Sequence, residues 1–231
     1  MEQPYRDDKR DGLAVYYYEE RVPVVYSYED TSSETANREK GKIKVEEPYK
    51  NDKREGLVRY YYRSGQLYSE SSYHNDKREG IAKYYHENGE LYFEEAYADG
   101  KLDGMVRSYY PRKVIKIVDS YKSGLKEGPS SSYYENGKLK REQFYTKGRL
   151  EGKSRHYYGN GQLKSERLYK DGLAQGVWKF YYEDGRLKAE VPFTEGKLKG
   201  GWRYYDESGE KVWMGDLSQG ISNEEDIFGV E

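Results

Sequence analysis

The sequence predicts an all-β fold: an elongated, twisted single antiparallel sheet, formed as a solenoid-like meander of tandem 24-residue β-hairpin repeats. Three observations lead to this prediction. A glycine recurs every 24 residues, tyrosines lie at fixed distances from that glycine, and turn dipeptides follow one another about every 12 residues. We call the recurring residues the marker glycines; they are Gly56, Gly80, Gly104, Gly128, Gly152, Gly176 and Gly200.

Aromatic residues repeat with the same period. One lies seven positions before each marker glycine, and a tyrosine lies five positions after it. A tyrosine ring is apolar but ends in a hydroxyl group, so it can cover a sheet and still contact water. The 29 tyrosines therefore explain how a chain with 35% charged residues could fold with little aliphatic core.

Each repeat has the pattern of a hairpin. In the unit that spans 80–103, Asn88 and Gly89 form the pair preferred in a two-residue type I′ turn, and Asp99-Gly100 supplies a second turn signal. The segments between the turns are rich in β-forming residues. A helix is disfavoured, because each interior glycine would cost about 1 kcal/mol.

A two-residue turn at Asn88-Gly89 fixes the expected register. It places Tyr85 opposite Tyr92 and Lys83 opposite Glu94. The basic–acidic pair recurs in three other units, which supports the register. These pairs are Arg59–Glu70, Arg155–Glu166 and Lys179–Glu190.

Alternation along the strands predicts two different faces. In the unit that follows Gly176, the more apolar face carries Trp178 and Phe180, whereas the opposite face carries Lys179 and Tyr181. The second face should therefore display a tyrosine row between rows of basic and acidic residues. A single hairpin is marginally stable at best, so neighbouring units must stabilise one another.

The predicted organisation is a repeat array over residues 1–214 with an acidic C-terminal cap or tail at 215–231. Two units are degenerate, one near 32–55 and one at 104–127. In the latter, Pro111 replaces the usual turn, which indicates either an irregular repeat or a local apolar surface for a partner.

Composition restricts the function. The formal charge is −2, from 40 basic and 42 acidic residues, which argues against nucleic acid as a partner. There is no cysteine, so thiolate metal sites and disulfides are excluded. No apolar segment approaches the length of a membrane span, and we expect a cytoplasmic protein for which membrane binding is unlikely.

No residue set indicates catalysis, a metal or a cofactor. The three histidines, His74, His86 and His156, share no metal-like spacing and are interpreted as packing or surface residues. The Gly-Asn-Gly segment at 159–161 lies at the hairpin-turn position of its repeat. A basic stretch at 138–155 is interpreted as the solvated face of two hairpins, with an anion site as the alternative.

The motif Tyr-Tyr-x-Asn-Gly-x-Leu-x-x-Glu occurs at 133–142, and its first seven positions recur at 157–163, where glycine fills the variable position. It resembles the variant MORN repeat of bacterial antitoxins that are encoded beside polymorphic toxins, and the resemblance covers about 5–213. This resemblance implies an extended antiparallel β array without catalytic residues that neutralises a toxin by binding it. Founding MORN repeats are linked to membranes and scaffolding.

We therefore expect a non-enzymatic protein-binding repeat protein, an antitoxin or immunity protein whose partner is a cognate toxin. The alternative is a structural scaffold or a membrane-associated organiser. Tyrosine is enriched at protein interfaces, so we expect the tyrosine row to contact the partner. Its residues are Tyr61, Tyr85, Tyr109, Tyr133, Tyr157 and Tyr181.

Overall fold

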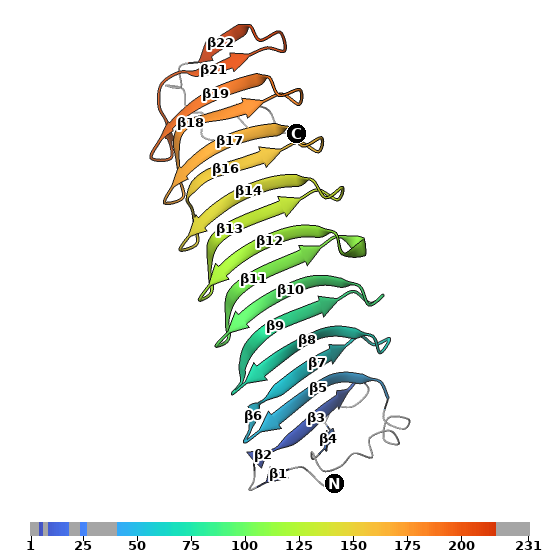
Figure 1. The fold of residues 1–231 in the computed structure, drawn as a ribbon. Coiled ribbons are helices and arrows are strands. Elements are labelled where there is room, and N and C mark those ends of the chain that lie inside the picture. Colours follow the sequence, from blue (N-terminus) through green and yellow to red (C-terminus); the bar gives the residue numbers. More distant parts are fainter. Residues whose placement is uncertain (1–4, 7–8, 19–23, 27–40, 216–231) are drawn as a thin grey trace. The chain divides into compact units, whose positions relative to one another are not determined.

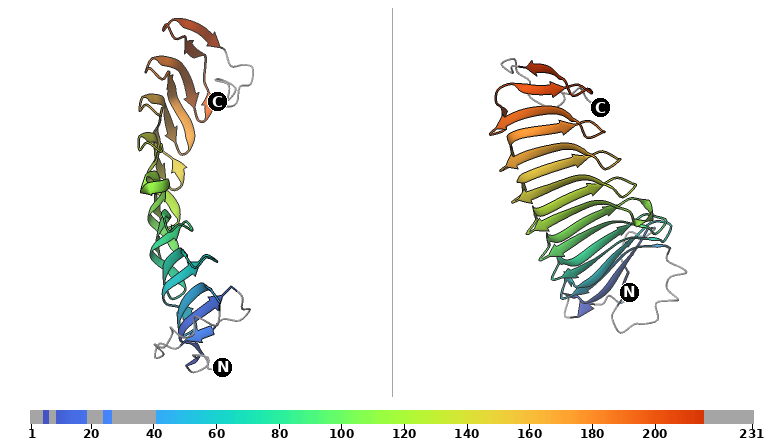
Figure 2. Two further views of the ribbon diagram at one scale, coloured as in Figure 1. Left: turned by 90° about the vertical axis from the view of Figure 1, so that its right-hand side faces the viewer. Right: turned by 45° about the horizontal axis from the view of Figure 1, so that its top comes forward.

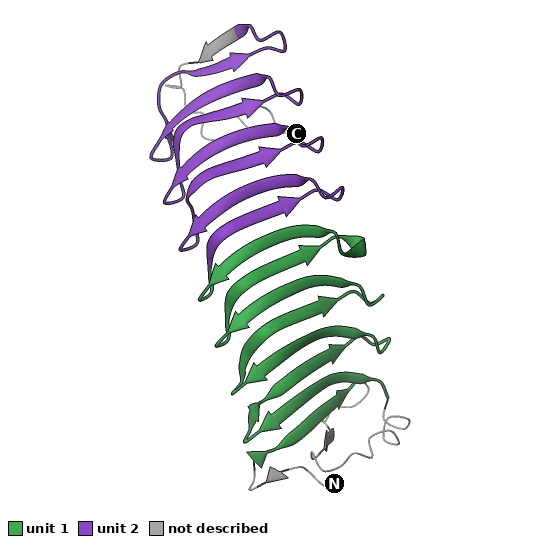
Figure 3. Ribbon diagram, in the orientation of Figure 1, with its two compact units in different colours: residues 1–125 green, residues 126–231 purple. Residues whose placement is uncertain are grey.

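The computed structural model describes residues 5–6, 9–18, 24–26 and 41–215. The chain divides into two compact units, residues 1–125 and 126–231 (Figure 3). We describe each unit by itself.

Unit 1 is an antiparallel meander in which strands that follow one another along the chain are hydrogen-bonded neighbours (Figure 1), except that Val24–Tyr26 and Ile43–Lys50 both pair with Gly12–Tyr17. A short ladder of β1 and β2 precedes it. Its strands are β1 (Tyr5–Arg6), β2 (Lys9–Arg10), β3 (Gly12–Tyr17), β4 (Val24–Tyr26), β5 (Ile43–Lys50), β6 (Lys53–Arg54), β7 (Gly56–Tyr61), β8 (Leu67–His74), β9 (Lys77–Tyr85), β10 (Leu91–Ala98), β11 (Lys101–Tyr109) and β12 (Ile115–Lys122).

Unit 2 has the same antiparallel arrangement, with more apolar residues on the face that contains its buried cluster. The all-β antiparallel meander predicted from the sequence is confirmed in both units, and Figure 2 shows each as a single layer of strands. The strands of unit 2 are β13 (Leu125–Tyr133), β14 (Leu139–Thr146), β15 (Arg149–Leu150), β16 (Gly152–Tyr157), β17 (Leu163–Lys170), β18 (Leu173–Tyr181), β19 (Leu187–Thr194), β20 (Lys197–Leu198), β21 (Trp202–Tyr205) and β22 (Lys211–Gly215).

The turn at Asn88-Gly89 differs from the prediction. The His86 amide donates to the Glu90 carbonyl at 2.8 Å, and the Gly89 amide donates back to the His86 carbonyl at 2.8 Å. Gly89 has a φ of 83°, whereas Asn88 does not have a positive φ. This is a three-residue loop that ends in a left-handed glycine, the geometry of a type I turn followed by a bulge. The prediction of a two-residue type I′ turn here was wrong.

The extra residue changes the pairing only beside the turn. Tyr85 lies opposite Leu91, so that Tyr92 is the bulged residue, and the predicted Tyr85–Tyr92 pair was wrong. Farther from the turn, Lys83 lies opposite Glu94 as predicted. The registers Arg59–Glu70, Arg155–Glu166 and Lys179–Glu190 are confirmed as well.

Type I′ geometry occurs instead in the turns at the other end of the strands, which connect one hairpin to the next. Asp99 and Gly100 both have positive φ, 51° and 77°. Both central residues of a type I′ turn need this conformation, which suits glycine, asparagine and aspartate. The same left-handed pair recurs at Asn51-Asp52, Asn75-Asp76, Ser123-Gly124, Lys147-Gly148, Asp171-Gly172 and Glu195-Gly196.

The marker glycines lie in β-bulges. Gly104 has a φ of 119°, and a Cβ atom at this position would lie 2.8 Å from the Cβ of Ala96. The ladder between β10 and β11 shifts register here, between the pairs Glu95–Val106 and Tyr97–Leu102. The bulge at Gly104 therefore needs glycine for both backbone conformation and space. All marker glycines share the positive φ, which explains the 24-residue period.

The residue before a marker glycine is hydrogen-bonded to the next of these turns along the chain. The Asp103 carboxylate accepts a hydrogen bond from the Ser123 amide at 3.0 Å. The Gly100 amide also donates to the Arg78 carbonyl of the preceding turn at 2.9 Å. The carboxylate contact recurs as Glu55–Asn75, Glu79–Asp99, Glu127–Lys147 and Glu151–Asp171. Backbone and side-chain hydrogen bonds between these turns thus join consecutive hairpins.

The N-terminal hairpin differs from the prediction of a degenerate unit near 32–55. Strand β3 pairs directly with β5, so that Gly12 lies opposite Tyr49 and Tyr17 opposite Ile43. Residues 43–50 are therefore the return strand of the hairpin that begins at Gly12. The degenerate unit expected near 32–55 does not form a hairpin of its own in the described residues. These contain eight hairpins, which begin at Gly12 and at the seven marker glycines.

The unit at 104–127 keeps the fold although its turn is altered. The 3₁₀ turn η2 (Pro111–Lys113) replaces the usual loop, with positive φ at Arg112 and Lys113. Strands β11 and β12 pair around it in the repeat register. Ile115 is the most exposed large apolar side chain of β12, at 40%. The predicted acidic cap or tail lies at 216–231, outside the described residues.

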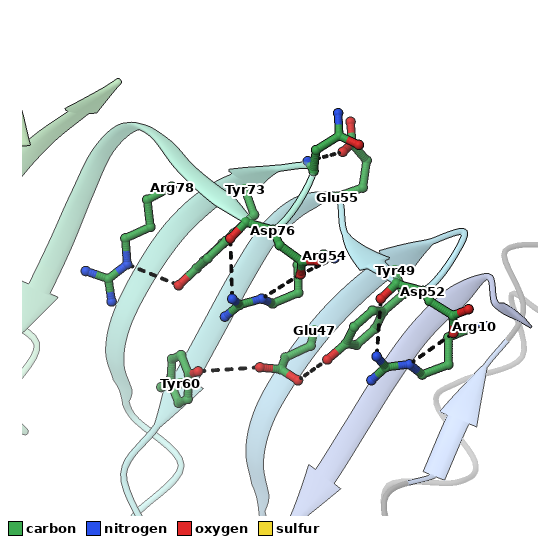
Figure 4. Close-up of polar contacts among 11 residues, drawn as sticks. Arg10, Glu47, Tyr49, Asp52, Arg54, Glu55, Tyr60, Tyr73, Asp76 and Arg78 are labelled. Carbon is green, nitrogen blue, oxygen red and sulfur yellow. Dashed lines mark hydrogen bonds and ion pairs between the residues drawn. The ribbon is translucent and has the colours of Figure 1, made fainter. Parts of the chain in front are cut away.

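One face of each sheet, called the packed face, contains most of the buried residues; Val15 and Tyr17 of the first hairpin are buried on the opposite face. In unit 2 a cluster forms around Trp178, Phe180, Val191 and Trp202. In unit 1 the cluster of Val45, Val58 and Tyr73 is smaller. Figure 4 shows that polar contacts accompany the rings of unit 1: the Tyr49 hydroxyl donates to Glu47 at 2.9 Å.

Candidate protein-binding surface

The opposite face of each sheet carries the tyrosine row, and we call it the ladder face. All six predicted tyrosines are half-buried on it. Four of their hydroxyls donate to a glutamate of the preceding hairpin. These hydrogen bonds are Tyr61–Glu46 at 2.7 Å, Tyr85–Glu70 at 2.9 Å, Tyr109–Glu94 at 2.6 Å and Tyr157–Glu142 at 2.7 Å.

These hydrogen bonds are absent where the repeat changes or the geometry differs. Val118 occupies the glutamate position of the repeat that would correspond to Tyr133. Tyr181 lies near Glu166 and Glu190, and its pKa is raised by burial and then by those carboxylates. The tyrosine row is thus a regular part of the sheet, and its rings are only partly available to a partner.

Three hydroxyls of the row are neutral donors at pH 7. Burial, followed by the hydrogen bond to glutamate, raises the pKa of Tyr85, Tyr109 and Tyr157 to about 12. These three residues therefore present uncharged rings between charged side chains.

Ion pairs continue the network in unit 2. The Arg155 guanidinium contacts Glu166 at 2.8 Å and Glu142 at 3.0 Å, while Lys153 contacts Glu166 at 3.0 Å. Hydrogen bonds from Arg155 and Lys153 lower the pKa of Glu166. The carboxylate is consequently ionised and paired at neutral pH, which suits a structural role rather than acid–base catalysis.

The predicted opposite-charge pairs are thus only partly ion pairs. Arg155–Glu166 is one. Arg59 instead contacts Glu46 on the other neighbouring strand, at 3.6 Å. The register alone did not determine which carboxylate each basic residue contacts, because a long side chain in a sheet can reach either of the two neighbouring strands.

Sequence reasoning missed a row of exposed apolar side chains on the ladder face. Ile81, Phe144, Leu168 and Val177 expose 52%, 46%, 40% and 50% of their surface. They lie two residues from a charged ladder position on the same strand, so they share its face. Their positions in the repeat could have revealed them. The residue directly after a marker glycine lies on this face, and so does the residue opposite it on the returning strand.

In unit 2 these apolar residues lie on consecutive hairpins. Phe144 is opposite Pro129, and Val177 is opposite Pro192. The Leu168 side chain lies over Gly176, 3.4 Å from the place a Cβ atom would take. We call Pro129, Phe144, Leu168, Val177 and Pro192 the apolar row of unit 2.

Comparison with known families finds one similarity. A family model described as a MORN repeat variant matches residues 54–75, 78–101, 126–147, 150–171 and 174–195. These five segments are therefore similar to MORN-variant repeats. The five matches fall on hairpins of the structure, and the altered turn at 111–113 lies outside them. A search of curated proteins finds no match to the chain.

The histidines do not form a site together. His74 contacts Glu55 at 2.8 Å, His86 stacks on Tyr92 at 4.5 Å, and His156 is half-buried on the packed face. Across the described ranges no three His, Asp or Glu side chains are grouped as metal ligands would be. The Gly-Asn-Gly segment at 159–161 forms a hairpin turn, as predicted. No helix in the part of the chain that the structure describes has the length and apolar character of a transmembrane helix.

Proposed function

We propose that this repeat protein is a non-enzymatic protein-binding module, and that its partner contacts the ladder face of unit 2. One observation supports this most: the apolar row of unit 2 is exposed beside ordered Tyr, Arg and Glu side chains. Lys153 lies opposite Leu168 and interrupts the row at β16. Exposed apolar residues that share one face with polar ones are typical of protein interfaces, and tyrosine and arginine are enriched at interface centres.

The ordered ladder favours binding for an entropic reason. Arg155 and Tyr157 are already fixed by Glu142 in the free protein. These two side chains therefore lose little additional conformational entropy when a partner contacts them, so more of the contact energy contributes to affinity. The repeated hairpins extend this surface over several strands.

We further propose that the partner is a toxin and that binding neutralises it, as in the antitoxins that carry similar repeats. The support is the resemblance of the repeat sequence together with a wide binding face. The test is co-expression with the product of the adjacent gene, followed by co-purification and a growth assay. A stable complex that restores growth supports the proposal, and the absence of a complex contradicts it.

Point variants locate the interface. Leu168→Asp and Val177→Asp place charges in the apolar row at exposed positions, so we expect folding to be retained and the affinity for the toxin to fall at least tenfold. The matched control is Ile115→Asp, an exposed apolar residue on the packed face. A complex unaffected by the first two variants would exclude this surface. Sedimentation of the protein with anionic liposomes would favour the membrane-organiser alternative instead.

A further inference from the structure

In five hairpins of the described chain, a lysine lies over a tyrosine ring beside the hairpin loop. The lysine is the bulged residue of the returning strand, and its ammonium nitrogen is between 5.3 and 5.9 Å from the ring centre. A cation at this distance is attracted by the face of an aromatic ring. The pairs are Lys44–Tyr18, Lys116–Tyr110, Lys140–Tyr134, Lys164–Tyr158 and Lys188–Tyr182.

Two hairpins of unit 1 have tyrosine at this lysine position. Tyr68 is the bulged residue beside Tyr62, and Tyr92 is the bulged residue beside His86. The ring centres of Tyr62 and Tyr68 are 5.2 Å apart, and His86 stacks on Tyr92 at 4.5 Å. Tyr84 joins the two pairs, because its ring centre is 6.3 Å from that of Tyr68 and 6.5 Å from that of Tyr92. We call these five residues the aromatic cluster of unit 1.

The aromatic cluster is accessible to solvent. Tyr68 exposes 38% of its surface, His86 is exposed, and Tyr62 and Tyr92 are half-buried. The Tyr68 ring makes an angle of 74° with the Tyr62 ring and 71° with the Tyr84 ring. These steep angles mean that the rings form walls of the cluster rather than layers of a closed stack.

The electrostatic surroundings of the cluster favour a positive charge. Burial, then Tyr68 and the exposed Glu87, raise the pKa of Tyr62. Burial, then the Tyr68 and Tyr62 hydroxyls, raise the pKa of Tyr92. No lysine or arginine among the described residues contributes to either shift, and Arg63 lies over a ring of the preceding hairpin instead, at 5.3 Å. Aromatic faces beside a carboxylate attract cations and repel anions.

We propose that the aromatic cluster of unit 1 binds a lysine side chain of a partner protein. Its ammonium group contacts the ring faces as the lysines of the five other hairpins do, with Glu87 nearby. Those hairpins show that the repeat accommodates an ammonium group beside these rings, and Tyr68 and Tyr92 leave this pair of hairpins without a lysine of its own. By strand alternation Tyr62 lies on the packed face of unit 1. The site is therefore independent of the ladder face of unit 2, and either proposal can fail alone.

The test is an NMR titration of the full chain with a five-residue peptide that carries trimethyllysine between glycine and serine residues. Trimethyllysine keeps its positive charge but has no N–H group, so it cannot donate a hydrogen bond to Glu87, and its binding reports on the rings. We expect saturable shifts of the tyrosine ring signals. The same peptide with uncharged norleucine in place of trimethyllysine should cause no saturable shift.

Tyr68→Lys introduces the lysine of the other hairpins, which should occupy the site from within the chain. We expect this variant to remain folded and to bind the peptide about tenfold more weakly. Tyr92→Lys is the corresponding change in the next hairpin and provides a second variant with the same expected loss. The matched control is Gln66→Lys, which adds an equal charge at the exposed loop of the Tyr68 hairpin and should change binding by less than about twofold.

Circular dichroism verifies that each variant is folded. Three results would overturn the proposal. The first is the absence of saturable shifts with the trimethyllysine peptide, and the second is an equal loss of binding in Tyr68→Lys and Gln66→Lys. The third is tighter binding of a neutral oligosaccharide such as maltotriose, which would stack on the rings without a charge.

Discussion

The packed faces of the two units are stabilised by different kinds of side-chain contact. In unit 1, the Arg54 guanidinium lies 4.2 Å from the Tyr73 ring centre and contacts Asp76 (Figure 4). Arg78 donates to the hydroxyls of Tyr73 and Tyr97. In unit 2 the corresponding repeat positions hold mostly apolar residues, such as Leu150 and Ala174 in place of Arg54 and Arg78.

The difference teaches that hairpin register and face chemistry are separate properties. Both units use the same bulges, turns and pairings, yet unit 1 stabilises its face by stacked arginines and unit 2 by Trp178, Phe180 and Val191. A guanidinium that stacks on a tyrosine ring buries apolar stem atoms and keeps its charge hydrogen-bonded, so it can replace an aliphatic residue.

The largest effect is expected from the apolar cluster of unit 2. Trp178 is 6% exposed, and its ring centre lies 4.3 Å from that of Phe193. Trp178→Ala should lower the free energy of unfolding of unit 2 by about 3–5 kcal/mol, because it leaves a cavity and an unpaired Leu168 carbonyl. Urea unfolding followed by circular dichroism measures this. The neighbouring exposed residue provides the control, since Lys179→Ala should change stability by less than about 0.5 kcal/mol.

The polar counterpart in unit 1 should be somewhat less costly to remove. Arg78→Leu takes a cation from beside Glu95 and three tyrosine hydroxyls, which should destabilise the protein by about 2–3 kcal/mol. The double variant Arg78→Leu/Glu95→Gln should recover about 1 kcal/mol, because the uncompensated charge is gone. If Arg78→Leu alone were stabilising, the polar contacts of unit 1 would not be what stabilises its face.

Two marker glycines allow a matched comparison of the units. Gly104→Ala combines a positive φ with a close approach to Ala96, so we expect a loss of about 2–3 kcal/mol. At Gly152 the φ is 74° and no atom lies within 4 Å of the added Cβ, so Gly152→Ala should cost about 1 kcal/mol. Thermal unfolding of the two variants measures the difference, and equal losses would show that backbone conformation alone requires glycine.

The smallest expected effect is a pH dependence confined to unit 2. The pKa of His156 is about 4 in the folded chain and about 6.5 in the unfolded chain. The unfolded state therefore binds more protons between these values, and stability falls as the pH falls. Allowing for partial solvent exposure, we expect a loss of about 1 kcal/mol between pH 7 and pH 5.

His156→Gln should remove this slope, and the control His86→Gln, at an exposed position, should retain it. The charged groups that act on His156 are Arg141, Arg167, Lys140 and Lys164. An unchanged slope in His156→Gln would assign the pH dependence to carboxylates elsewhere in the chain.

The turns show where local sequence is not sufficient. Asn88-Gly89 and Asp99-Gly100 are both favourable type I′ pairs, yet only the second adopts that geometry. The strands around Asn88-Gly89 place one more residue in the loop, and Gly89 alone becomes left-handed. The error displaced Tyr85 by one partner but left Lys83–Glu94 correct, because the bulge at Tyr92 restores the register.

The sequence by itself determined the repeat length, the all-β hairpin pattern and the two faces of each sheet. It did so because bulge glycines and left-handed turns admit few residue types, and because side chains alternate along a strand. The tertiary structure alone decided which partner each charged side chain contacts, where the hairpin of β3 closes, and which apolar residues remain exposed. Those properties depend on neighbouring strands, and side chains such as Arg59 can reach more than one of them.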